Sequence, residues 1–91
     1  MRFQWDPEKA ESNFIRHGID FDDAVLIFDG MTVEVEDDRF GYGEIRVRAI
    51  GVSRSRLVVV IYTMRGEICR IISARMATRH EQKTYRDAER R

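Results

Sequence analysis

A continuous apolar run near the middle of the chain, residues 57–62, constrains the fold more than any other feature. It reads LVVVIY, with three consecutive valines followed by isoleucine, residues whose branched side chains favour strands. A strand with one solvated face alternates apolar and polar residues, whereas this run is apolar at every position. We therefore expect a central strand that is covered on both faces.

Three further strands are predicted around this run. From Met31 the apolar period changes from 3.6 residues to 2, because valines alternate with threonine and glutamate. A second alternating segment follows a polar connection, and Arg65-Gly66 predicts a tight hairpin turn into the last strand. The predicted strands, which form an antiparallel meander, cover residues 31–36, 44–49, 57–62 and 67–73.

Two helices are predicted before the strands. Asp6-Pro7 begins the first, because aspartate caps the free amides of a helix and proline is tolerated at its first position. Gly18 is placed to end this helix. A second, short helix is expected from about Phe21 to Phe28.

The last helix begins at Thr78, where Thr78-x-x-Glu81 forms a capping box, and it runs to about Glu89. The predicted fold class is therefore α+β, with two N-terminal helices, a four-stranded antiparallel sheet and a C-terminal helix. Residues 1–91 are expected to form a single domain, since no linker, repeat or low-complexity segment divides them.

The formal net charge of zero conceals a strong asymmetry between the two halves of the chain. Residues 1–44 hold four basic and twelve acidic residues, whereas residues 45–91 hold twelve basic and four acidic ones. Such a distribution predicts either a basic face that binds a polyanion, flanked by an acidic face, or pairing between the two halves.

Several classes of function lack their sequence signals. No apolar run approaches the ~18 residues of a membrane span, and the N-terminus has no apolar signal-peptide region. We expect a cytoplasmic protein without membrane contact. The single Cys69, expected to be buried, and two widely spaced histidines give no metal-ligand set. Neither a glycine-rich phosphate loop nor a serine nucleophile elbow is present, so we expect no metal and no cofactor.

Arginines are the strongest candidates for a functional site. Arg70 interrupts an apolar strand, where its desolvation is costly unless a partner or ligand offsets it. Arg75 is expected on the turn before the last helix, whose N-terminal amides favour anions. Planar guanidinium groups suit phosphate oxygens, although a carboxylate of the first half is an alternative partner for Arg70.

Arg46 and Arg48 share one face of a predicted strand. Arg46 is a candidate for binding phosphate. The alternative is that both arginines pair with Glu34 and Glu36 across the hairpin, which would contribute about 0.2–1 kcal/mol per pair.

Three other residues are candidates for acid–base chemistry. His17 is expected at a helix C-terminus, and histidine is the residue type most often used to move protons at physiological pH. Glu44 opens a strand on the face of Arg46, and Tyr62 ends the central strand. Each also has a structural interpretation, namely a capping histidine, a solvated strand-end carboxylate and a core tyrosine.

Short motifs lie along nearly the whole chain. They are F-x-W-D-P-x-K-A from Phe3, H-G-I-x-F-x-x-A from His17, Glu44-x-Arg46, R-I-I-S-A-R from Arg70, and A-T from Ala77. Together they resemble the motifs of BrnT toxins, and R-I-I-S-A-R is the most specific of them. Members commonly carry an acidic residue where this chain has Met64, so no carboxylate is available there.

The resemblance carries expectations about function. BrnT proteins are the toxin halves of type II toxin–antitoxin modules and have a fold similar to RelE-like ribonucleases. The resemblance implies cleavage of RNA, inhibition of translation and a tight complex with a BrnA-like antitoxin, a ribbon-helix-helix protein. Operator DNA would be bound only through that complex.

We hypothesise metal-independent RNA cleavage, in which Arg46, Arg70 and Arg75 stabilise the phosphate and His17, Glu44 or Tyr62 moves protons. An alternative function is a non-catalytic interaction protein that binds a ribbon-helix-helix partner and acts in operon autoregulation. Direct DNA binding is disfavoured, because no helix-turn-helix pattern is present.

Overall fold

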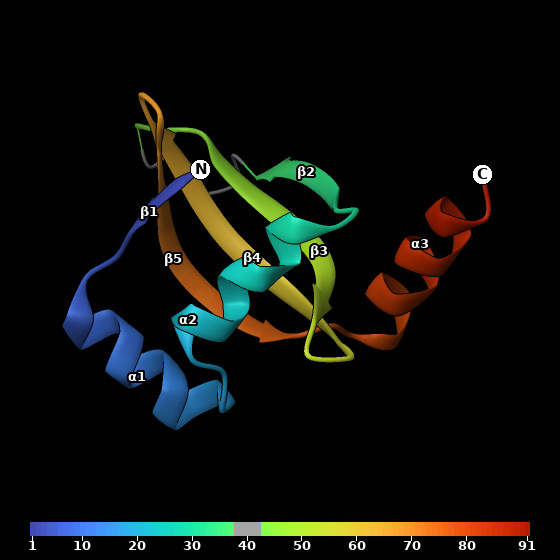
Figure 1. The fold of residues 1–91 in the computed structure, drawn as a ribbon, viewed down its shortest axis with the longest axis horizontal. Helices are drawn as coiled ribbons and strands as arrows, with labels where there is room; N and C mark the ends of the chain where they lie inside the picture. The colour runs from blue at the N-terminus through green and yellow to red at the C-terminus, as the bar shows by residue number, and fades with distance from the viewer. Residues whose placement is uncertain (38–42) are drawn as a thin grey trace.

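The structure, a computed structural model, describes residues 1–37 and 43–91 and is built around one five-stranded sheet (Figure 1). The strand order is β1-β5-β4-β3-β2, with β1 parallel to β5 and every other neighbour antiparallel. The elements are β1 (Arg2–Gln4), α1 (Pro7–His17), α2 (Phe21–Ala24), the 3-10 helix η1 (Val25–Asp29), β2 (Val33–Asp37), β3 (Arg46–Ser53), β4 (Arg56–Arg65), β5 (Ile68–Met76) and α3 (Arg79–Glu89).

The α+β class is confirmed, but the predicted four-stranded antiparallel sheet is wrong in detail. β1 adds a fifth, parallel strand beside β5. Three residues are too few to show a period of 2, so this strand has no signal in the sequence. The second predicted helix is also divided into the short α2 and the 3-10 helix η1.

The predicted start and end of α1 are confirmed by its caps. The Asp6 side chain accepts a hydrogen bond of 2.9 Å from the Glu8 backbone N–H. Gly18 adopts a left-handed conformation with φ of 71°, and its N–H donates to the Phe14 carbonyl at 2.8 Å. These caps fix the length of α1 and therefore the positions of its polar side chains.

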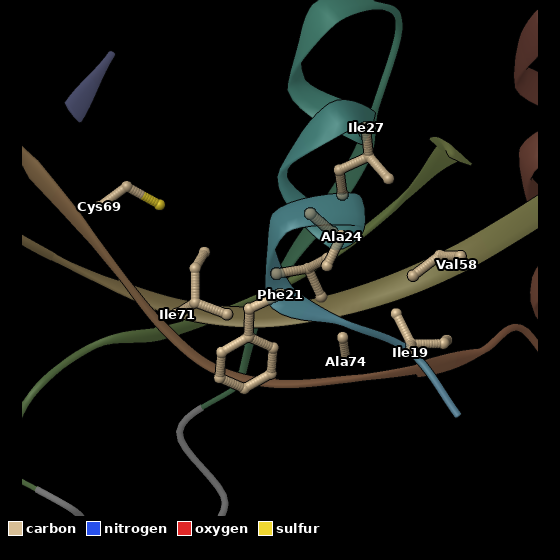
Figure 2. Packing of buried hydrophobic residues seen from close by; sticks show 10 residues of the cluster. Ile19, Phe21, Ala24, Ile27, Val58, Cys69, Ile71 and Ala74 are labelled. Carbon is tan, nitrogen blue, oxygen red and sulfur yellow. The ribbon is translucent and has the colours of Figure 1, made fainter. Parts of the chain in front are cut away.

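The first face of the sheet carries the larger core, covered by α2 and η1 (Figure 2). Gly51 of β3 allows η1 to approach closely, because a Cβ at this position would lie 2.7 Å from the Ile27 Cβ. The buried residues of this core are Ile19, Phe21, Ala24, Ile27, Ala49, Val58, Val60, Cys69, Ile71 and Ala74.

The second face is only partly covered. Ile50 and Val59 pack with Ala77 and with Tyr85 of α3. Val58 and Val60 point to the first face and Val59 to the second, so the prediction of a central strand covered on both sides is confirmed. The part of the second face beyond α3 carries polar side chains.

Asn13 of α1 binds the outer edge of β5. Its side-chain amide donates to the Ala74 carbonyl at 2.9 Å and accepts from the Ala74 N–H at 3.1 Å. A third hydrogen bond joins it to the Ile19 carbonyl. β1 pairs with β5 only as far as Arg70. At Ala74 the buried Asn13 amide therefore satisfies the backbone N–H and carbonyl that a longer neighbouring strand would otherwise pair.

Candidate functional site

Four arginines lie on the second face of the sheet, which we call the arginine face: Arg46 and Arg48 of β3, and Arg70 and Arg75 of β5. The strand register places them together. Paired residues share a face, and Arg48 lies in one row with Ile61 and Ser73. The neighbouring rows place Arg75 beside Val59 and Arg70 beside Thr63. The arginines thus flank β4 from both sides.

Arg75 belongs to β5, so its predicted position on a turn is wrong. The strand continues to Met76, because Val58 and Val59 of β4 still pair with this part of β5. The prediction ended the strand at residue 73, although strand pairing rather than local sequence decides where a strand ends.

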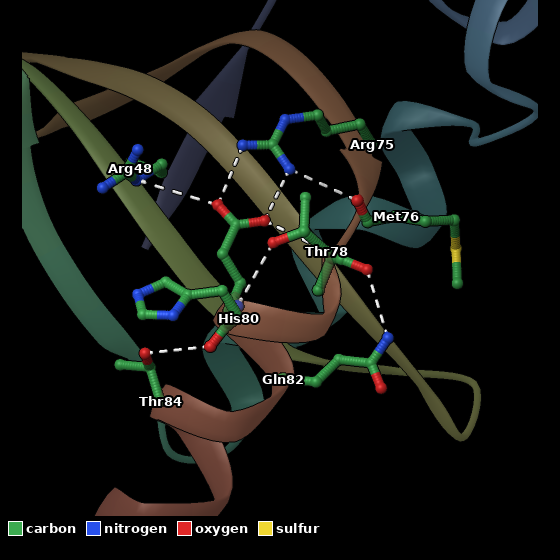
Figure 3. Close-up of polar contacts among 9 residues, drawn as sticks. Arg48, Arg75, Met76, Thr78, His80, Gln82 and Thr84 are labelled. Carbon is green, nitrogen blue, oxygen red and sulfur yellow. Dashed lines mark hydrogen bonds and ion pairs between the residues drawn. The ribbon is translucent and has the colours of Figure 1, made fainter.

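Glu81 holds Arg75 through two hydrogen bonds, from Nη1 to Oε1 at 2.7 Å and from Nη2 to Oε2 at 2.9 Å. Arg48 approaches the same carboxylate from β3, with its Nε 4.0 Å from Oε2. Figure 3 shows both arginine side chains directed from the sheet toward the start of α3. The glutamate is 8% exposed, so the arrangement is a half-buried ion pair rather than a solvated one.

The same glutamate closes the capping box of α3. Its carboxylate accepts from the Thr78 N–H at 2.9 Å, and its own N–H donates to Thr78 Oγ1 at 3.2 Å. The hydrogen bonds from Arg75, supported by the one from Thr78, lower the pKa of Glu81 to about 2. One carboxylate therefore fixes both the helix start and the Arg75 guanidinium.

Arg70 is half-buried. It forms no hydrogen bond or ion pair within residues 1–37 and 43–91. Its backbone pairs with Thr63 on one side and with Gln4 of β1 on the other, so the strand is fixed on both sides. Within the part of the chain that is described, the alternative of a first-half carboxylate as partner of Arg70 is not observed. Arg75 does have a carboxylate partner, but this is Glu81 of the second half.

The prediction that Glu44 opens a strand is wrong, because β3 begins two residues later, at Arg46. The Glu44 carboxylate Oε2 is 3.6 Å from Arg65 Nη2. The adjacent Ile45 carbonyl accepts a hydrogen bond of 2.7 Å from Thr63 Oγ1, which ties this segment to β4. Glu44 is therefore held at the end of the sheet where β3 begins.

The predicted cross-strand pairs of Arg46 and Arg48 with Glu34 and Glu36 are wrong. In the β2–β3 register, Val35 pairs with Arg48, while the two glutamates pair with Ala49 and Val47. An offset of one residue in a strand moves a side chain to the opposite face. The glutamates consequently project to the first face and leave the arginine face.

Two of the candidate acid–base residues lie elsewhere. Tyr62 is on the first face, where its hydroxyl donates to Glu34 and its ring packs edge-on against Phe28 at 5.4 Å between centroids. Burial, and then the hydrogen bond to Glu34, raise its pKa well above the usual value. His17 is exposed at the end of α1 and lines a hollow between α1 and β5.

The structure places Arg46, Arg70 and Arg75 on one face of the sheet, but the sequence did not reveal that Glu81 binds Arg75. The capping box was visible in the sequence, yet it indicated only a helix start. An arginine six residues before the glutamate gives no local signal, because the contact requires β5 to run directly into α3.

Among the described residues, no three His, Cys, Asp or Glu side chains lie close enough to hold a metal ion. No helix in this part of the chain is long and apolar enough to cross a membrane.

The fold and the site define a small α+β protein whose sheet presents four arginines on one face. A family model described as the ribonuclease toxin BrnT of type II toxin–antitoxin systems matches residues 5–81. The chain therefore belongs to the BrnT family, which confirms the resemblance found in its motifs and implies an antitoxin partner. Comparison with curated proteins gave no match.

Proposed function

We propose that this chain is an endoribonuclease that cleaves cellular RNA without a metal ion and so inhibits translation. The observation that carries the proposal is the arginine face, on which Arg70 has no protein partner in residues 1–37 and 43–91. Guanidinium groups bind phosphate through planar, permanently charged forks. Arginines on a rigid sheet can therefore supply the positive charge that phosphodiester cleavage requires.

In the proposed reaction the ribose 2′-oxygen attacks the adjacent phosphorus. The 2′-O–P bond forms as the P–O5′ bond breaks, and the products carry a 2′,3′-cyclic phosphate and a 5′-hydroxyl. The proton of the 2′-hydroxyl goes to a base, and the departing 5′-oxygen takes up a proton from water. Preorganised cations stabilise the negative charge that develops on the phosphoryl oxygens.

Glu44 is the proposed base. It lies beside Arg46 at the end of the sheet, and its side chain is 31% exposed, so a ribose can reach it. Its contact with Arg65, at 3.6 Å, is longer than a direct hydrogen bond and holds the carboxylate loosely. Asp37 pairs with Arg46 in the β2–β3 register, so it is the alternative carboxylate for the role of base. The test below compares the two residues.

Glu81 acts as a positioning residue in this proposal. A guanidinium held by two hydrogen bonds has a defined orientation, and groups fixed in this way lose little entropy when they bind a phosphate. Arg75 is thereby oriented before RNA arrives, and Arg48 lies near the same carboxylate at 4.0 Å. Arg70 contributes a charge that has no partner in the part of the chain that the structure describes.

The test uses purified chain, free of antitoxin, incubated with RNA in EDTA. We expect cleavage with 2′,3′-cyclic phosphate ends, a loss of activity in Arg70→Ala, and a loss of about 10²–10⁴-fold in Glu44→Gln but not in Asp37→Asn. Arg90→Ala removes an exposed charge from the last turn of α3 and serves as the control. If the Arg70→Ala and Arg90→Ala variants cleave equally well, the arginine face is not the active site.

The antitoxin is proposed to be a BrnA-like ribbon-helix-helix protein, through which the complex binds operator DNA. The proposal rests on membership of the BrnT family. Co-expression of the chain with such a protein should give a stable complex that binds operator DNA, whereas the chain alone should not. DNA binding by the isolated chain would contradict it.

A groove between α3 and the β3–β4 hairpin favours a second candidate function, a non-catalytic interaction protein. Val52 and Met76 at this groove are 44% and 43% exposed, and Arg56 and Arg86 lie beside them. An amphipathic, acidic helix of an antitoxin would match these apolar and basic groups. Met76→Lys should weaken antitoxin binding more than Ile15→Lys, which adds the same charge at an exposed position of α1. Antitoxin binding without any RNA cleavage would favour this candidate.

A further inference from the structure

We infer that the hollow between α1 and β5, here called the α1–β5 hollow, binds the phosphodiester backbone of RNA next to the arginine face. The inference rests on the proposed ribonuclease function and names a second contact region for the same substrate. The side chains that line the hollow are Lys9, Ser12, Asn13, Arg16, His17, Ile72 and Ser73.

The spacing of the polar residues on α1 builds this site. Ser12 and Arg16 follow Lys9 by three and seven residues, so all three share one face of the helix. Asn13 lies among them and is fixed to the Ala74 backbone of β5 by two hydrogen bonds. The cations are therefore held at the edge of the sheet by a buried anchor.

The charge of the hollow differs from that of the surrounding sequence. Residues 1–44 contain twelve acidic and only four basic residues, and two of those four, Lys9 and Arg16, line the hollow. Among the described residues no acidic side chain lines it. Both cations are exposed, so an anion can reach them without displacing a protein partner. A phosphate chain therefore finds in this hollow a positive region within an otherwise acidic half.

Ser73 connects the hollow to the arginine face. It lines the hollow and also pairs with Ile61, in the row of the sheet that contains Arg48. Arg75 follows two residues later in β5, on the same face, which corresponds to a rise of about 7 Å along the strand. One RNA strand can therefore lie across the arginine face and continue over the edge of β5 into the hollow.

Contacts between cationic side chains and RNA phosphates make the affinity for RNA depend on salt concentration. For single-stranded nucleic acid each neutralised phosphate contributes about 0.7 to the slope of log K against log salt concentration. A Lys9→Ala/Arg16→Ala variant should therefore bind RNA more weakly and show a slope smaller by about 1.4. The charge-conserving Lys9→Arg/Arg16→Lys variant should retain the wild-type slope.

Binding is measured by fluorescence anisotropy with a 2′-O-methyl RNA oligonucleotide at several salt concentrations. This RNA cannot be cleaved, because its 2′-oxygen carries no proton, so the result does not depend on catalysis. The matched control is Arg86→Ala/Arg90→Ala, which removes two charges from α3. Circular dichroism verifies that each variant is folded.

A reduced slope in Lys9→Ala/Arg16→Ala, with an unchanged slope in the control, supports the inference even if the chain cleaves no RNA. An unchanged slope and affinity in this variant overturn the inference even if the chain is an active ribonuclease. An equal reduction in the control overturns it as well, because net charge alone would then explain the effect.

Discussion

Replacing Glu81 with glutamine isolates the charge of the carboxylate that holds Arg75. Glutamine has nearly the same volume and can still accept the Thr78 N–H hydrogen bond, since either residue closes a capping box. The variant therefore keeps the helix start and loses the charge that faces Arg75 and Arg48.

The magnitude follows from the pKa of Glu81, which lies at about 2 instead of its usual 4.5. That difference corresponds to about 3 kcal/mol between folded and unfolded chains. Because 32% of each arginine side chain is exposed, solvent reduces the expected contribution to about 2 kcal/mol at pH 7.

The sign of the pH dependence is set by the lowered pKa. The stability that Glu81 contributes is fully present above about pH 4.5, and it is lost as the pH falls toward 2, because the unfolded chain takes up the proton first. The difference in the free energy of unfolding between wild type and Glu81→Gln should therefore be constant from pH 7 to 5. By pH 3 it should fall to less than half.

Urea unfolding at a series of pH values measures this difference. Asp87→Asn is the matched control, because Asp87 also forms ion pairs on α3, with Lys83 at 2.8 Å and Arg90 at 3.8 Å. Its side chain is 43% exposed, whereas that of Glu81 is 11% exposed. Exposed pairs contribute little, so Asp87→Asn should change the free energy of unfolding far less. A difference between wild type and Glu81→Gln that does not vary with pH, or that matches the control, would refute the role assigned to Glu81.

Three further substitutions test the packing that positions the site, each by urea unfolding. Gly51→Ala should lower the free energy of unfolding by about 1–3 kcal/mol, because its Cβ would lie 2.7 Å from the Ile27 Cβ; an unchanged value would mean that η1 can move away. Asn13→Ala should lower it by at least about 2 kcal/mol, because it leaves both backbone groups of Ala74 without partners, and faster amide exchange at that residue should accompany the loss. Ser55→Gly should raise it by about 1 kcal/mol, because serine adopts φ of 66° there; a decrease would contradict the expected relief of strain.

Local sequence was sufficient for the elements whose signals are short-range. The caps of α1 and the capping box of α3 lie where their sequence motifs predict them. The apolar run of β4 is buried on both faces, because Val58 and Val60 belong to the core of the first face and Val59 to that of the second. Each of these features depends on residues within a few positions of one another.

Features that depend on pairing between distant segments could not be predicted in this way. The strand β1 exists because Arg2–Gln4 lies beside β5, more than sixty residues later in the chain. The length of β5 likewise depends on β4, and it moves Arg75 from the predicted turn into the strand. The contact between Arg75 and Glu81 follows from that position and was missed for the same reason.

The register between β2 and β3 decides where Glu34 and Glu36 lie relative to the arginines of β3. If Glu34 and Glu36 paired with the arginines of β3, the two halves would neutralise each other on one face. Because Val35 pairs with Arg48 instead, the glutamates lie on the first face, where Glu34 accepts the Tyr62 hydrogen bond. The sheet thus places Glu34 and Glu36 on one face and Arg46 and Arg48 on the other, and the zero net charge of the chain conceals this separation.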